Sequence, residues 1–283
     1  MSTARLSVML FPFHAGLSEG TLAVESLLRD FRAAGISGLE PMLYPEGAEP
    51  AWWDTLFRVA KDTGMRQACL DIGVDLVGTG EADRRAALDL VARGVEFCRK
   101  IECPIALLAG SCPGPGMSNA EGRKLLAESL ARAAERAEGS GVTLTIEDFG
   151  VYPAFTCSAA HVAEVLDAAA HPDLRVTFDN GNFLYADEQP VAAYPRLRDR
   201  VLHVHIKDFT LASEPVAGAL QSLAGRQWVG APIGRGEAQV SECLSLLRAD
   251  GYEGWLSLEV GCEPPLEDAV RGAAFLREAW EVH

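Results

Sequence analysis

The chain has 283 residues, 48% of them hydrophobic, and a formal net charge of −15. A single barrel domain of roughly 250 residues fits this length, and so acidic a surface argues against a nucleic-acid partner. No apolar run approaches the roughly 18 residues of a membrane span, and no signal-peptide pattern opens the chain. The seven cysteines include no CxxC pair, which indicates reduced, mostly buried thiols. We therefore expect a cytoplasmic protein without a membrane partner.

Short β-type runs alternate with amphipathic helical patterns along the whole chain. Strands are expected near residues 6–11, 37–41, 66–72, 105–109, 142–147, 174–179, 201–207 and 254–260. Helices are expected near residues 18–34, 50–64, 81–100, 119–139, 158–169, 190–198, 238–250 and 265–281. This alternation predicts parallel βαβ units, and eight units favour one α/β domain over residues 1–283, a single (β/α)8 TIM barrel. An open doubly wound sheet is the alternative, but no GxGxxG follows the first strand.

Two stretches break the alternation. Residues 110–118 form a Gly/Pro-rich loop after the fourth strand, and residues 209–237 form a long excursion after the seventh. Loops this long in a compact domain are often functional. Both follow the carboxyl ends of strands, where barrel enzymes place their active sites.

Four chemically similar positions close the last four β runs. These residues are Glu147 in TLTIEDFG, Asp179 in RVTFDNGNF, His205 in VLHVHIKDF and Glu259 in WLSLEV. Residues of the same parity as each are mostly polar, and residues of the other parity are apolar. Because side chains alternate across a strand, the polar parity predicts the inside of a closed barrel. Three carboxylates and one imidazole at one end of that barrel indicate a site for a fairly hard divalent cation.

These runs belong to a longer series of motifs. In chain order it reads IEDFG, DNGN, HVHIKD, GRGE and GYEGWLSLE. Together, at barrel spacing, the motifs resemble the sugar phosphate isomerase/epimerase superfamily, also called xylose isomerase-like or AP endonuclease family 2 barrels, over nearly the full length.

The resemblance implies a metal site and a chemistry. In ketose 3-epimerases, Mn²⁺, Mg²⁺ or Co²⁺ is held by Glu, Asp, His and Glu from strands five to eight, which correspond here to Glu147, Asp179, His205 and Glu259. Zn²⁺ stays an open alternative as the single bound ion. The resemblance also gives Glu147 and Glu259 a second role as the acid/base pair that moves a proton beside the carbonyl of a small sugar or polyol-like substrate.

Two positions depart from the ketose 3-epimerase pattern. Asn182 stands where those enzymes have a histidine, and Leu211 stands where they have an arginine. Both of those residues contact substrate oxygens in the epimerases. The sequence therefore predicts an isomerase or epimerase of sugars or sugar phosphates that is not a close ketose 3-epimerase.

Three alternatives remain open. A metal-dependent dehydratase of the inosose or dehydroshikimate type shares the first step of the reaction. An AP endonuclease needs three zincs and a basic surface, for which six histidines and a net charge of −15 are poorly suited. A degenerate barrel that only binds a ligand is the third. The sequence does not mark an interface, so it leaves open whether the protein is a monomer or a homo-oligomer.

Further residues near the strand ends are candidates for substrate contact. Asn182 is one, with a turn residue as its alternative, and Lys207 is another, with a buried salt bridge to Asp208 or Glu237 as its alternative. Arg235 in GRGE could bind a carboxylate or phosphate or be a solvated loop charge. We expect Asp208 and Glu237 to contact and position the residues of the site without binding the metal or the substrate themselves.

Three more residues complete the predicted site. His14 follows the first strand and Glu40 ends the second, so both are expected to line the barrel mouth and are candidates for substrate contact. His203 shares the parity of His205 and is expected to be hydrogen-bonded inside the barrel rather than to be a ligand.

Overall fold

The computed structural model describes residues 3–45 and 49–282, and within these ranges parallel strands build one sheet. Its strands are β1 (Arg5–Met9), β2 (Gly38–Glu40), β3 (Met42–Leu43), β4 (Arg66–Gln67), β5 (Leu70–Gly73), β6 (Ile105–Ala109), β7 (Thr143–Glu147), β8 (Arg175–Asp179), β9 (Val201–Ile206) and β12 (Trp255–Leu258). Their order is β3-β5-β6-β7-β8-β9-β12-β1-β2-β4.

The sheet closes on itself. β2 pairs with β4 and β3 pairs with β5, so the two ends of the strand order are neighbours. β2 with β3, and β4 with β5, are each one strand with an interruption, and the hydrogen bond from Asp71 N to Pro41 O (2.9 Å) spans the gap. The 10 segments therefore form an eight-stranded barrel, which confirms the predicted fold class.

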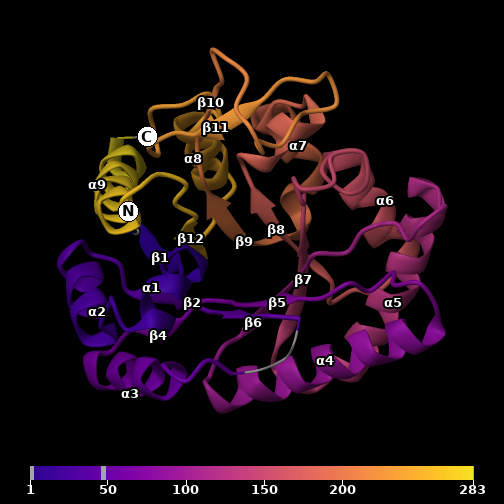
Figure 1. Ribbon diagram of the computed structural model, residues 1–283, viewed down its shortest axis with the longest axis horizontal. Helices are drawn as coiled ribbons and strands as arrows, with labels where there is room; N and C mark the ends of the chain where they lie inside the picture. The colour runs from indigo at the N-terminus through magenta and orange to yellow at the C-terminus, as the bar shows by residue number, and fades with distance from the viewer. Residues whose placement is uncertain (1–2, 46–48, 283) are drawn as a thin grey trace.

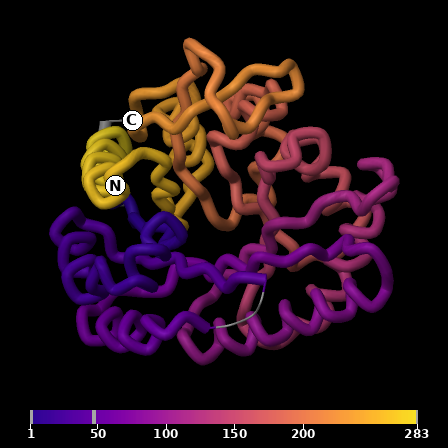
Figure 2. The backbone as a smooth tube through the Cα atoms, viewed as in Figure 1, coloured from indigo at the N-terminus to yellow at the C-terminus, as the bar shows by residue number. Residues whose placement is uncertain are grey.

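Helices surround this barrel in the view of Figure 1. Their bounds are α1 (His14–Glu19), α2 (Val24–Ala33), α3 (Trp53–Thr63), α4 (Glu81–Lys100), α5 (Asn119–Ala137), α6 (Ala159–Ala169), α7 (Pro190–Leu197), α8 (Val240–Ala249) and α9 (Pro265–Val282), with single 3-10 turns η1 (Phe11–Phe13), η2 (Asn182–Ala186) and η3 (Arg198–Arg200). The first and last strands of the barrel are neighbours, because β1 pairs with β12. The two ends of the chain therefore lie close together (Figure 2). No helix in the described ranges is long and apolar enough to cross a membrane.

Two predicted segments differ from the structure. The helix expected over 18–34 is two helices, because Gly20 adopts a left-handed conformation (φ 72°) that ends α1. The excursion over 209–237 contains an antiparallel hairpin of β10 (Phe209–Leu211) and β11 (Trp228–Gly230). The sequence did not predict this hairpin, since its strands are only three residues long.

Both faces of the sheet are buried, and they differ in polarity as the parity predicts. The apolar parity packs under the helices, as Ile146 and Val204 do. The polar parity fills the barrel interior, where Thr145, Thr177 and Ser257 are fully buried. The Oγ1 atoms of Thr145 and Thr177 lie 2.8 Å apart in one hydrogen bond. The barrel interior therefore holds buried polar side chains that hydrogen-bond between strands.

Candidate metal centre

The four predicted ligands lie together at the carboxyl ends of four adjacent strands. Glu147 ends β7, Asp179 ends β8, His205 lies in β9 and Glu259 directly follows β12. Asp179 and His205 are direct register partners. Because parallel strands end at one edge, a short stretch of each strand is enough to bring the four side chains to one place.

The imidazole of His205 is oriented toward the three carboxylates. Its Nδ1 atom lies 3.6 Å from Glu147 Oε2, 3.9 Å from Asp179 Oδ2 and 3.5 Å from Glu259 Oε2. The ring is fully buried, and Nδ1 has no hydrogen-bond partner. The opposite nitrogen, Nε2, donates to Glu40 Oε1 at 2.8 Å. A buried imidazole nitrogen that faces three oxygens, with its other N–H on a carboxylate, fits the environment of a metal-binding histidine.

Charge around His205 matches this geometry. Burial alone would lower the pKa of His205, but the negative charge of Glu40 and the nearby carboxylates of Glu147 and Glu259 raise it well above the ordinary value. The raised pKa of His205 reflects the negative charge of the several carboxylates that surround this one imidazole. A divalent cation would neutralise that charge, and the oxygen-rich donor set suits a hard ion.

Lys207 places a cation at the edge of the same cluster. Its Nζ atom lies 2.9 Å from Asp179 Oδ2, 2.6 Å from Glu259 Oε1 and 3.1 Å from Asn182 Oδ1. The alternative of a salt bridge to Asp208 or Glu237 is not what the structure shows, because the lysine side chain pairs with Asp179 and Glu259 instead. Burial opposes the charge, yet the nearby carboxylates raise the pKa of Lys207 above its ordinary value.

The D-x-G-N motif is explained by packing around Asp179. The Asp179 Oδ1 atom accepts hydrogen bonds from the backbone N–H groups of Gly181 (2.9 Å) and Asn182 (3.1 Å). Its Oδ2 atom accepts one from Asn182 Nδ2 at 3.0 Å. A Cβ atom at Gly181 would lie 2.4 Å from Lys207 Cγ. The motif therefore fixes the Asp179 carboxylate and leaves room for the lysine chain.

Glu40 and His203 lie inside the barrel, behind His205. Glu40 is fully buried, and its carboxylate accepts hydrogen bonds from His203 Nε2 (3.0 Å), His205 Nε2 (2.8 Å) and Ser257 Oγ. Although burial opposes ionisation, the two histidines lower the pKa of Glu40 well below its ordinary value. Glu40 was expected at the barrel mouth; the structure instead gives it contacts that support His205. His203 is hydrogen-bonded inside the barrel, as expected.

The GRGE segment is held by Asp208. The Asp208 carboxylate accepts backbone N–H bonds from Gly234 (3.0 Å), Gly236 (2.8 Å) and Ala238 (3.0 Å). Glu237 is exposed, and its carboxylate accepts a hydrogen bond from the backbone N–H of Leu211 in β10. Arg235 is also exposed and forms no ion pair within the described ranges. Asp208 therefore positions the loop that ends the excursion, while no contact brings Arg235 to the ligands.

His14 lies in a separate groove. Its ring centroid is 4.6 Å from that of Tyr44 and 6.0 Å from that of Trp52, and the groove that it lines has a volume of about 780 Å³.

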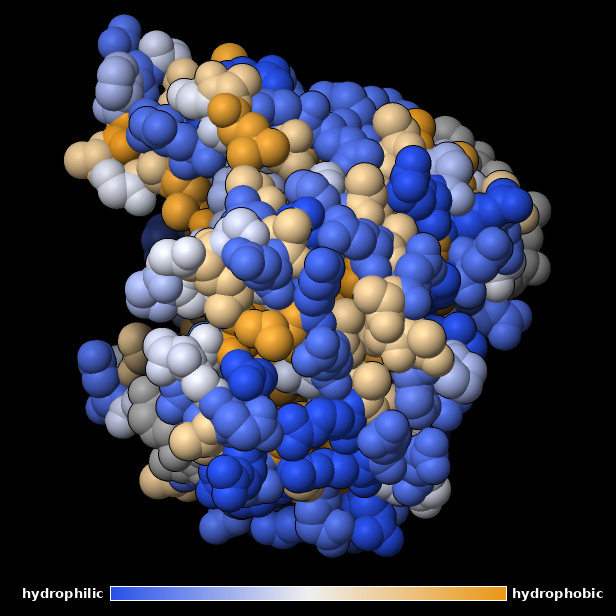
Figure 3. All heavy atoms as spheres, turned by 90° about the vertical axis from the view of Figure 1, so that its right-hand side faces the viewer, coloured by the Kyte–Doolittle hydropathy of each residue, from blue (hydrophilic) through white to orange (hydrophobic). Residues whose placement is uncertain are grey.

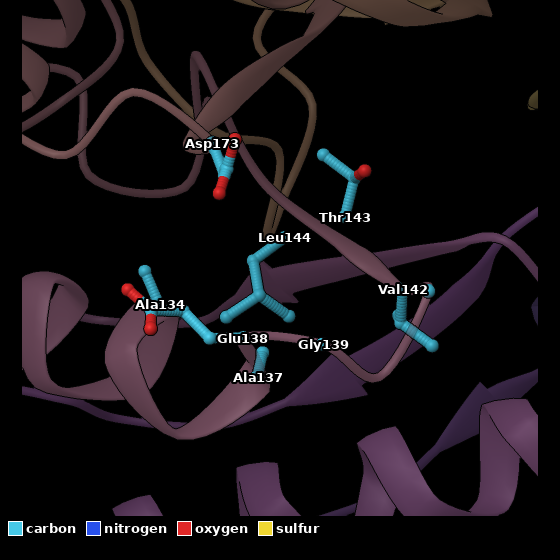
Figure 4. Close-up of a pocket in the computed structure, with 9 residues that line it drawn as sticks. Ala134, Ala137, Glu138, Gly139, Val142, Thr143, Leu144 and Asp173 are labelled. Atoms are coloured by element: carbon cyan, nitrogen blue, oxygen red, sulfur yellow. The ribbon is translucent and has the colours of Figure 1, made fainter.

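The surface of the molecule is hollowed along the left edge of Figure 3, which is the side that faces the viewer in Figure 1. The cavity in Figure 4, about 330 Å³, is elsewhere: it is lined by Thr143, which begins β7, whereas Glu147 ends that strand.

Sequence reasoning missed three buried residues near the ligands. Asp71 is 2% exposed and has an unpartnered Oδ2 atom, and burial followed by the charge of Glu40 raises its pKa well above the ordinary value. Asp148 accepts the backbone N–H of Asp179 at 3.0 Å. Cys69 lies near Asp71, 3.9 Å from Sγ to Oδ1. The only available signal was the inward parity of Asp71 in its strand.

Comparison with protein-family models identifies the family. The model of the xylose isomerase-like TIM barrel family matches residues 28–279, so the chain belongs to this family. This confirms the predicted superfamily. Inosose dehydratase from Clostridium botulinum (strain Eklund 17B / Type B) is 32% identical over 108 residues, which cover 36% of this chain and 36% of that relative. The match thus spans about a third of the relative's length.

Solved structures share the whole fold. A structure of L-ribulose 3-epimerase superposes with a TM-score of 0.72 at 16% identity and covers 99% of this chain and 95% of its own. A structure of the IOLI protein with a binding zinc atom has a TM-score of 0.75 at 14% identity and covers 98% of both chains. At these identities the likeness concerns the fold.

Proposed function

We propose that the protein holds one divalent metal ion with Glu147, Asp179, His205 and Glu259 and removes a proton beside the carbonyl of a small polyhydroxylated substrate. The observation that carries the proposal is the buried Nδ1 atom of His205, which has no hydrogen-bond partner and faces the three carboxylates at 3.5–3.9 Å. Mn²⁺, Mg²⁺ and Co²⁺ suit this donor set, and the zinc in the IOLI structure keeps Zn²⁺ in consideration.

The metal and the side chains have separate tasks. A bound divalent ion would supply Lewis-acid polarisation of the carbonyl. Glu147 is 8% exposed and the Glu259 side chain 16% exposed, so both carboxylates border the space in which a substrate could lie. One of them accepts the proton from carbon, and the other serves as its acid/base partner. Lys207 and Asn182 orient substrate oxygens beside Asp179.

Two outcomes share this first step. Return of the proton to a different position or face gives a sugar or sugar phosphate isomerase or epimerase, and the pair Glu147 and Glu259 supports it. Loss of a β-hydroxyl as water gives a dehydratase. The partial match to an inosose dehydratase favours this second outcome, and the Lys207 ammonium could donate the proton that the departing hydroxyl needs.

Exchange with deuterated solvent tests the common step. Inososes and ketoses are incubated in D₂O with the protein and Mn²⁺, Mg²⁺, Co²⁺ or Zn²⁺, and then with EDTA. For one substrate we expect the proton beside the carbonyl to be exchanged for deuterium only when metal is present. Mass spectrometry of the substrate measures this exchange. A product that absorbs as an enone identifies dehydration. A product that is a different sugar and has no enone absorbance identifies isomerisation or epimerisation.

Two variants and a control accompany this experiment. Glu147→Gln and Glu259→Gln should each reduce exchange by roughly 100-fold or more, because one removes the proton acceptor, the other removes its acid/base partner, and both change a proposed metal ligand. Glu96→Gln changes an exposed glutamate on α4 and should leave the rate unchanged. Full activity of Glu259→Gln would show that the glutamate pair is not the acid/base pair.

A further inference from the structure

Glu40 collects three hydrogen bonds from distant parts of the barrel wall. It lies on β2, whereas His203 and His205 lie on β9 and Ser257 on β12. In the strand order, β12 and β1 separate β9 from β2, so the contacts cross the barrel interior. All four residues are fully buried. No proton-transfer or substrate-binding role in the proposed reaction uses Glu40.

The three partners all donate, which makes the carboxylate hard to replace. His203 Nε2 and His205 Nε2 lie 3.0 Å and 2.8 Å from different Glu40 oxygens, and Ser257 Oγ bonds to the one that accepts from His203. An ionised carboxylate can only accept, so both histidines must carry their proton on Nε2. The Nδ1 atom of His205 is then turned toward Glu147, Asp179 and Glu259.

From this arrangement we propose that Glu40 is a positioning residue, which fixes the ring orientation of His205 from across the barrel and so sets the metal affinity of the site. The inference rests on the proposed metal centre. Glu40 does not touch the substrate; it acts through His205. A glutamine cannot take its place, because one carbonyl oxygen and one NH₂ group would face three donors, and at least one donor would be left unpaired in a dry interior.

Cobalt binding to Glu40→Gln tests the proposal. Titration calorimetry gives the affinity, and the visible absorption of bound Co²⁺ reports whether an imidazole remains in its coordination sphere. We expect affinity to fall about 10- to 100-fold, the usual effect of removing a hydrogen-bond partner of a metal-binding histidine, together with a changed absorption spectrum. Glu40→Asp keeps the charge but shortens the reach, and serves if Glu40→Gln does not fold.

A matched control separates positioning from stability. Asp268 is also a fully buried carboxylate, on α9, and accepts the Cys262 backbone N–H at 3.1 Å. Asp268→Asn should lower the melting temperature while leaving Co²⁺ affinity and absorption unchanged. If Glu40→Gln behaves like Asp268→Asn, the carboxylate is only structural and the proposal is overturned.

The metal-free protein distinguishes this inference from the proposed function. If the wild-type protein binds no Co²⁺, the proposed metal centre fails, but crystal structures without metal still test the role of Glu40. A His205 ring that turns away from Glu147 and Glu259 in the Glu40→Gln crystal supports positioning. A ring in the wild-type orientation overturns it.

Discussion

Replacing Gly181 by alanine tests how tightly the D-x-G-N turn is packed against Lys207. Gly181 has φ −82°, which an alanine adopts without strain, so the destabilising effect expected in the folded protein is steric. The added Cβ atom would lie 2.4 Å from Lys207 Cγ and 2.9 Å from the Phe209 ring, against 3.4 Å for ordinary contact. One side must therefore move by about 1 Å. Overpacking of this kind costs about 1–3 kcal/mol.

Urea denaturation of Gly181→Ala measures that cost, and metal titration of the same variant shows whether displacement of Lys207 disturbs the ligands. Gly80→Ala is the control, because a Cβ atom there meets nothing within 4 Å and φ is −173°. Because Gly80 is the N-cap of α4, where alanine is a poorer cap than glycine, the control should cost about 0.5–1 kcal/mol and leave metal affinity unchanged. A Gly181→Ala protein as stable as the control would refute the packing argument.

Three further outcomes are expected. Ser118→Ala removes the capping box with Glu121 at the start of α5 and should lower the unfolding free energy by about 1 kcal/mol in urea; an unchanged midpoint contradicts this. Asp208→Asn cannot accept the backbone N–H groups of Gly234, Gly236 and Ala238 together, so a loss of about 1–3 kcal/mol and faster proteolysis of that loop should follow; unchanged cleavage counts against it. A divalent ion at 100 times its dissociation constant should add about 2.7 kcal/mol of stability, which EDTA reverses in a thermal melt; a melting temperature insensitive to both argues against the site.

The sequence was sufficient to predict the barrel and the meeting of the four candidate ligand residues, for one physical reason. Strand periodicity is local, so the parity of Thr145, Thr177 and Ser257 shows which face is inward without knowledge of the partners. Chain order then places the ends of consecutive parallel strands at one edge. The helix over 81–100 was predicted with the bounds of α4, because its amphipathic pattern is long.

Contacts across the barrel could not be predicted in this way. Glu40 is 163 residues from His203, and strand periodicity carries no information about which inward side chains meet over such a separation. The same limit explains why the salt-bridge alternative for Lys207 named Asp208, which is adjacent in sequence but on the opposite parity, and not Asp179 or Glu259. The short strands of the β10–β11 hairpin have too few residues for a periodic signal.

Anomalous diffraction from a crystal soaked in Mn²⁺ tests the central claim most directly. The account predicts one peak roughly 2.0–2.4 Å from His205 Nδ1 and from oxygens of Glu147, Asp179 and Glu259. The cluster of Glu40, Cys69 and Asp71 also brings potential ligand atoms together and provides an internal comparison. A peak at that cluster, or none at His205, would contradict the proposed centre.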